Sequence, residues 1–139
     1  MKINQNMREY LSHLQEHESA LSPELSSVLA AGFVEKSGCV LLASAECGSA
    51  VPRDPTEDDT GYECFINHLH VNDLSEALQF ARRLKCALAE RFTDVFVIIV
   101  SFDGREATVR FHRLRAGQTW LDENLEGYLD EGIAVLDSD

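Results

Sequence analysis

The chain has 139 residues and a formal net charge of −12, with 12 basic against 24 acidic side chains. Nucleic acids and anionic membranes repel so acidic a protein, so neither is expected as a partner, whereas a basic protein would be attracted. The length favours one domain over residues 1–139. We divide it into a helical N-terminal segment, residues 1–33, and an α+β core, residues 38–139.

Two short helices are predicted near the N-terminus. Apolar residues recur at helical spacing between Met7 and Leu14, and Ser22 followed by Pro23 is typical of a helix start, with Gly32 as the stop. No secretory signal precedes them, and no apolar run reaches membrane-spanning length. We therefore expect a cytoplasmic protein.

A strand, a loop and a second strand are expected next. The apolar run Cys39–Ala45 predicts a strand, and the acidic stretch Cys47–Gly61, which contains two prolines, predicts an exposed loop. We expect the second strand over Tyr62–Val71, with Phe65 and Leu69 on one face.

The clearest element is a long helix from about Leu74 to Arg91, where apolar residues continue at helical spacing. Asp73, just before this helix, and Glu76, in its first turn, have the form of a capping box. In that motif Asp73 accepts a hydrogen bond from the amide of Glu76, and the Glu76 carboxylate reaches back.

A hairpin and a last strand follow this helix. Val95–Val100 is continuous and β-branched, as in a strand buried at the centre of a sheet, and Asp103–Gly104 predicts a two-residue hairpin turn. The returning strand alternates, with Ala107, Val109 and Phe111 on one face and Thr108, Arg110 and His112 on the other. Asp122–Tyr128 is expected to form a helical turn, and Ile133–Leu136 a strand. The fold predicted is α+β, with a largely antiparallel sheet of about five strands packed against one long helix.

The last quarter of the chain is acidic but also apolar. No basic residue follows Arg115, yet Trp120, Leu125 and other apolar residues alternate with the carboxylates, which indicates a packed segment. A packed acidic segment presents charge in a fixed shape and suits a basic protein partner. Together with the acidic loop at residues 54–59, it supplies the candidate partner-binding residues Glu57, Asp58, Asp59, Asp122, Glu123, Glu126 and Glu131.

Basic residues gather between Arg82 and Arg115. A nucleic-acid stripe would have aromatic residues interleaved among them, and these are missing apart from the inward-facing Phe111. We therefore expect these cations to pair with the protein's own carboxylates.

Sequence motifs of enzymes are missing. The chain has no G-x-S-x-G, P-loop or G-x-G-x-x-G pattern, so we expect no enzyme, no cofactor and no bound metal. The alternative is a small metal-binding protein or enzyme that uses Cys64, His68, His70 and His112, since these residue types bind zinc and His68 and His70 share a strand face. No C-x-x-C pair supports that alternative. A regulatory or scaffold domain is the third interpretation.

Three stretches of the C-terminal half carry a family resemblance: Val109–Leu121, Leu125–Tyr128 and Ile133–Asp137. They resemble the small immunity proteins of bacterial polymorphic toxin and contact-dependent growth inhibition systems, in particular immunity protein 10. The resemblance covers the chain from Tyr62 onward. It implies a non-enzymatic cytosolic protein that binds and blocks one cognate toxin domain, often a basic nuclease. The carboxylates would then mimic phosphate and occlude the toxin both sterically and electrostatically.

Overall fold

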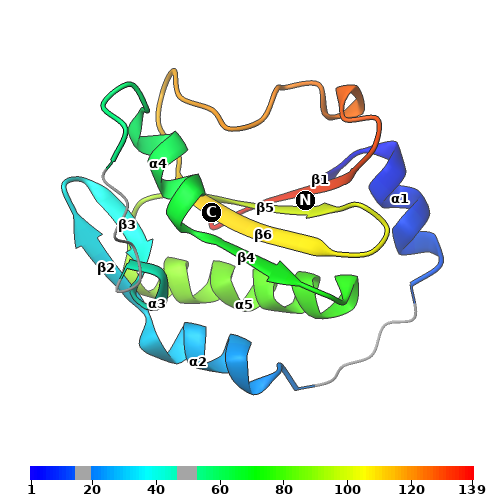
Figure 1. The fold of residues 1–139 in the computed structure, drawn as a ribbon, viewed down its shortest axis with the longest axis horizontal. Coiled ribbons are helices and arrows are strands. Elements are labelled where there is room, and N and C mark those ends of the chain that lie inside the picture. Colours follow the sequence, from blue (N-terminus) through cyan, green and yellow to red (C-terminus); the bar gives the residue numbers. More distant parts are fainter. Residues whose placement is uncertain (15–19, 47–52) are drawn as a thin grey trace.

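The computed structural model describes residues 1–14, 20–46 and 53–139 (Figure 1). Among these residues, five strands form an antiparallel sheet in the order β1-β7-β5-β6-β4, which confirms the predicted α+β fold. The strands are β1 (Lys2–Ile3), β7 (Gly132–Asp137), β5 (Phe96–Phe102), β6 (Ala107–Arg113) and β4 (His68–Val71).

One face of this sheet is covered by α5, which spans Leu74–Arg91 as predicted. Phe80 and Leu84 on the inner side of α5 belong to the same apolar cluster as Ile98 of β5 and Phe111 of β6. Phe80, Ile98 and Phe111 are completely buried, and Leu84 is 1% exposed. Removing such side chains from water supplies most of the driving force for folding.

The prediction of a capping box at the start of α5 is wrong about the hydrogen-bond partners of Asp73 and Glu76. Asp73 accepts a hydrogen bond from the amide of Ser75 at 3.0 Å, not from that of Glu76. The Glu76 carboxylate accepts from the amide of Ser22 at 3.0 Å. Ser22 is itself the N-cap of α2, so the hydrogen bond to Glu76 connects the start of α2 with the start of α5.

The N-terminal segment contains strands as well as helices. α1 (Gln5–Ser12) and α2 (Pro23–Ala31) confirm the two predicted helices, and Gly32 ends α2 with a φ of 74°. The unpredicted strand β1 pairs with β7, however, and a second unpredicted strand, β2 (Phe33–Lys36), pairs with β3 (Cys39–Leu42) in a separate two-stranded sheet. Residues 1–33 are therefore part of the sheet architecture.

Two predicted strands are shorter than expected because helices replace part of each. The first ends at Leu42, where α3 (Ala43–Glu46) begins. The second is wrong over most of its length, since α4 spans Asp59–Ile66 and only β4 is extended. Asp58 caps α4 by accepting from the amide of Gly61 at 2.7 Å. Residues 47–52 of the predicted loop lie outside the described residues.

The β5–β6 hairpin confirms the predicted alternation of β6, whose Ala107, Val109 and Phe111 are buried towards α5. Its turn spans residues 103–106 rather than two residues, because Phe102 pairs with Ala107. The Asp103 carboxylate accepts from two turn amides at 2.8 Å.

Glu63 of α4 and Asn67, the C-cap of that helix, join the two sheets where strands β3 and β6 do not pair. The Glu63 carboxylate accepts from the amide of Val40 in β3 at 2.7 Å and from the amide of Arg113 in β6 at 2.8 Å. One turn later, the Asn67 amide group bonds Leu42 and Val40 of β3 at 2.8 Å each. These side chains satisfy backbone groups that an adjoining strand would otherwise satisfy.

The charge of Glu63 is balanced inside the protein. Glu63 is completely buried, and the Arg115 guanidinium donates to its carboxylate at 2.6 Å. Arg115 also donates to the hydroxyl of Thr60 at 3.1 Å and to the carbonyl of Gly38 at 3.2 Å. A buried carboxylate is tolerated only when its charge and its lone pairs are satisfied in this way.

We predict that Glu63→Ala lowers the free energy of unfolding by about 3 kcal/mol or more, because it leaves Arg115 and two backbone amides without their acceptor. Urea denaturation followed by circular dichroism measures this. Glu35→Ala is the matched control, since its ion pair with Arg113 is long, 3.8 Å, and exposed on the Glu35 side. The control should change stability by less than about 1 kcal/mol. Equal effects of the two substitutions would contradict the assigned role of Glu63.

Candidate functional site

The acidic last quarter crosses the sheet face that α5 does not cover. We call residues 114–131, which connect β6 to β7, the strap. In Figure 1 the strap runs above the sheet from α4 to α1. The Gln118 side chain accepts from the amide of Thr60 at 3.2 Å, and the Asn4 side chain donates to the carbonyls of Leu125 at 3.2 Å and Glu131 at 2.9 Å. The segment is therefore packed at both ends.

The predicted helical turn lies in the second half of the strap. It is a 3-10 helix, η1 (Leu125–Gly127), capped by Asn124, whose side chain accepts from the amide of Glu126 at 3.2 Å. Tyr128 closes the turn by donating its backbone N–H to the carbonyl of Leu125 at 3.3 Å, and its hydroxyl accepts from the amide of Asp122 at 3.0 Å. These local bonds fix the course of the strap over the sheet.

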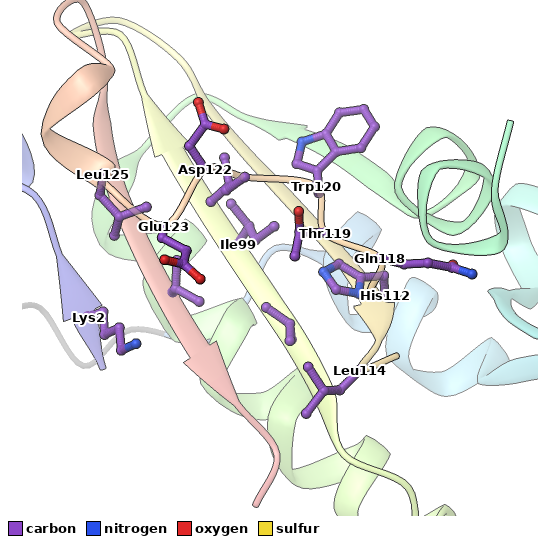
Figure 2. A pocket seen from close by; sticks show the side chains of 13 residues that line it. Lys2, Ile99, His112, Leu114, Gln118, Thr119, Trp120, Asp122, Glu123 and Leu125 are labelled. Atoms are coloured by element: carbon purple, nitrogen blue, oxygen red, sulfur yellow. The ribbon is translucent and has the colours of Figure 1, made fainter. Parts of the chain in front are cut away.

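A pocket of about 220 Å³ lies between the strap and the sheet (Figure 2). Its floor is apolar, built by Val97 and Ile99 of β5 and Val135 of β7, which share one sheet face because Ile99 pairs with Val135. Leu121 and Leu125 of the strap complete its apolar lining. The sequence analysis did not identify this pocket. The available signal was that β5 is apolar on both faces, so its second face also needs a cover.

His112 of β6 is the buried polar side chain of the pocket, with 4% of its surface exposed. Its Nδ1 lies 2.8 Å from the carbonyl oxygen of Arg113. Because a carbonyl can only accept, Nδ1 carries a proton, and Nε2 of the neutral ring is then an acceptor. Burial lowers the pKa of His112 below its ordinary value, outweighing the opposing effect of that hydrogen bond. The ring is therefore neutral near pH 7.

An aromatic residue and a cation stand beside the pocket. Trp120 of the strap lines it and is 40% exposed. The Arg110 guanidinium, projecting from β6, lies 4.9 Å from the centre of the Trp120 ring. This cation–π contact orients the indole from the sheet side.

Three of the seven predicted partner-binding residues have structural partners. Asp58 caps α4, and Glu126 accepts from the amide of Gln5 at 2.7 Å. Asp59 forms an ion pair with Arg53, and the hydrogen bond from Arg53 lowers the pKa of Asp59 below its usual value. These carboxylates still contribute negative charge, but their positions are determined by the fold.

The other four predicted residues lie along the strap and the segment before α4. Asp122 and Glu123 are exposed and line the pocket, and Glu131 is exposed at the end of the strap near α1. Glu57 is half-buried, beside Gly61 of α4. Because the strap contacts α4 through Gln118, the two predicted acidic segments adjoin each other.

The alternative metal site is not assembled. Cys64 is buried in α4, and burial raises the pKa of its thiol to about 12, so it is not a thiolate. The rings of His68 and His70 lie 5.4 Å apart on β4. Arg110, which has no lone pair to offer a metal, stands opposite His68 and two residues before His112 on the same face. Within the described ranges, no three His, Cys, Asp or Glu side chains are grouped to hold a metal ion.

We predict that His112 makes stability depend on pH. Its pKa in the folded protein lies below the ordinary 6.5, so the unfolded chain takes up a proton first as the pH falls through that value, and stability is lost on acidification. Urea denaturation between pH 7.5 and pH 5 measures the effect. The loss should be smaller in His112→Gln and unchanged in the control His13→Gln, since His13 is exposed. Identical pH profiles for all three proteins would contradict the prediction.

In the part of the chain that the structure describes, no helix combines the length and apolar character needed to cross a membrane.

Comparisons with known proteins place the chain in a family. No curated protein and no solved structure matches the chain. The model of the Uncharacterized protein PM0498 family matches residues 2–139, and the chain therefore belongs to this family.

Proposed function

We propose that this chain is an immunity protein that binds and neutralises one cognate toxin domain, a basic nuclease, by covering its nucleic-acid-binding surface. The observation that supports this most directly is the adjacency of the two acidic segments. The strap meets α4 at the Gln118–Thr60 hydrogen bond, so the acidic segment before α4 lies beside the start of the strap.

Electrostatics favour such a partner. The net charge of −12 attracts a basic protein and increases its rate of encounter, by roughly 10- to 1,000-fold for steered association at low salt. Exposed carboxylates such as Asp122, Glu123 and Glu131 offer the acceptor geometry that the toxin's Lys and Arg side chains use on phosphate. The same charge disfavours nucleic acid and anionic membranes as partners.

Exposed apolar side chains on the strap support a protein partner further. Among the described residues, five large apolar side chains are exposed, and three of them, Leu114, Trp120 and Leu129, belong to the strap. A fourth, Phe65, projects from the adjoining helix α4. Protein interfaces combine such apolar anchors, tryptophan above all, with a charged rim.

The cytoplasm is the compartment that fits this function. Cys39, Cys64 and Cys86 are free thiols, and Cys86 is exposed, as expected where thiols stay reduced. Binding by occlusion also requires no catalytic group and no cofactor. The proposal therefore assigns the protein no enzymatic activity.

The test is association of the purified chain with the C-terminal domain of a large toxin protein encoded by a neighbouring gene, measured by stopped-flow fluorescence of Trp120. We predict that the association rate constant falls steeply between about 20 mM and 150 mM salt. The double variant Asp122→Asn/Glu123→Gln should associate several-fold more slowly at low salt, because it removes charge from the binding surface.

The matched control for this experiment is Glu24→Gln/Glu90→Gln, which removes the same charge from helices α2 and α5 on the opposite side of the sheet. The control should retain an association rate close to that of the wild type. Absence of any complex would refute the proposed function. A complex whose rate does not respond to salt would refute the electrostatic mechanism.

A further inference from the structure

We propose that the pocket beneath the strap receives an arginine side chain of the toxin partner. This inference rests on the proposed function and names the contact at the centre of the interface. The pocket is smaller than the roughly 300–1,000 Å³ typical of sites for drug-sized ligands, since its volume is about 220 Å³. Its size therefore suits a single side chain better than a cofactor.

The lining matches a side chain that has an apolar stem and a polar head. Val97, Ile99 and Val135 form an uninterrupted apolar floor, on which methylene groups can be buried. Trp120 lies on the strap side of the same space (Figure 2), and Leu121 of the strap also lines it. A short polar residue such as Ser or Asp would leave this apolar surface uncovered.

Three polar side chains that line the pocket, His112, Asp122 and Glu123, offer acceptors. At the β6 end, the buried His112 has its Nδ1 proton engaged with a backbone carbonyl, which leaves Nε2 as an acceptor. At the β7 end, Glu123 extends from the strap over the floor (Figure 2). Asp122 and Glu123 outnumber Lys2, the one basic side chain among the described residues that line the pocket. A cationic donor is therefore the complementary head group.

Arginine satisfies these conditions better than lysine does. The guanidinium is weakly hydrated, so its partial burial costs less free energy than that of a compact ammonium group. Its five donors in a plane can reach an imidazole nitrogen or pair with a carboxylate while the stem lies on the floor. Arginine is also enriched among the residues that dominate protein interfaces.

The experiment uses a probe that does not depend on the toxin. N-acetyl-arginine-N-methylamide is titrated into the protein, and NMR shifts of the Trp120 indole and the His112 imidazole are followed. The capped lysine and the capped, uncharged norleucine analogues are compared. We expect the shifts to saturate for arginine at the lowest concentration.

Glu123→Gln should weaken arginine binding roughly fivefold, and Val135→Phe should abolish it by filling the floor. Glu90→Gln is the matched control, which removes an acidic charge from α5 on the opposite side of the sheet and should leave binding unchanged.

Each result decides the inference. Norleucine binding as tightly as arginine, or arginine shifts that persist in Val135→Phe, would overturn it. With the toxin domain itself, Val135→Phe and Glu123→Gln should raise the dissociation rate constant. If the wild-type protein and both variants bind the toxin equally, the pocket is not the contact, although the proposed function stands. If the wild type does not bind the toxin at all, the proposed function fails and the assignment of a toxin arginine fails with it.

Discussion

The buried ion pair between Glu63 and Arg115 is the interaction on which the arrangement of the molecule depends. It lies where α4, β3 and the end of β6 meet. The Glu63 carboxylate accepts hydrogen bonds from the amides of Val40 and Arg113 and from the guanidinium of Arg115. Through it the small sheet β2–β3 is attached to the large sheet without any strand pairing between them. Arg115 is also the second residue of the strap, so the same contact determines where the strap leaves the sheet.

Three arginines at the end of β6 and the start of the strap contact other groups of the protein, which leaves the rest of the strap acidic. Arg113 pairs with Glu35 and Asp94, Arg115 with Glu63, and Arg110 lies against Trp120. Among the described residues, Arg113 and Arg115 thus pair with carboxylates as expected of the basic cluster, whereas Arg110 contacts an indole ring instead. The strap, which contains no basic residue beyond Arg115, is left with its acidic side chains exposed. One face of the sheet thus supports folding against α5, while the other presents negative charge over an apolar pocket.

Local sequence patterns were sufficient for the elements whose conformation is decided locally. α5, the β5–β6 alternation, the turn in the strap and β7 all follow from periodicity and turn residues. α4 could not be predicted in this way, because Glu63 and Asn67 are held by partners 23 to 50 positions distant along the chain. The acidic residues of the candidate site were identified from composition. Some of these carboxylates have partners within the fold and others do not, and this depends on the path of the strap over the sheet. The pocket beneath them depends on the same path, which no local pattern specifies.

The pairing of β1 with β7 has a consequence for the order in which the molecule is completed during synthesis. Lys2 and Ile3 emerge from the ribosome long before their partners Val135 and Ala134. The hairpin β5–β6 and α5 can associate earlier, because they are close in sequence. The pocket receives Lys2 from one end of the chain and Val135 from the other. Its wall therefore closes only after translation of β7, and a nascent chain halted before β7 would have the core helix without the binding face.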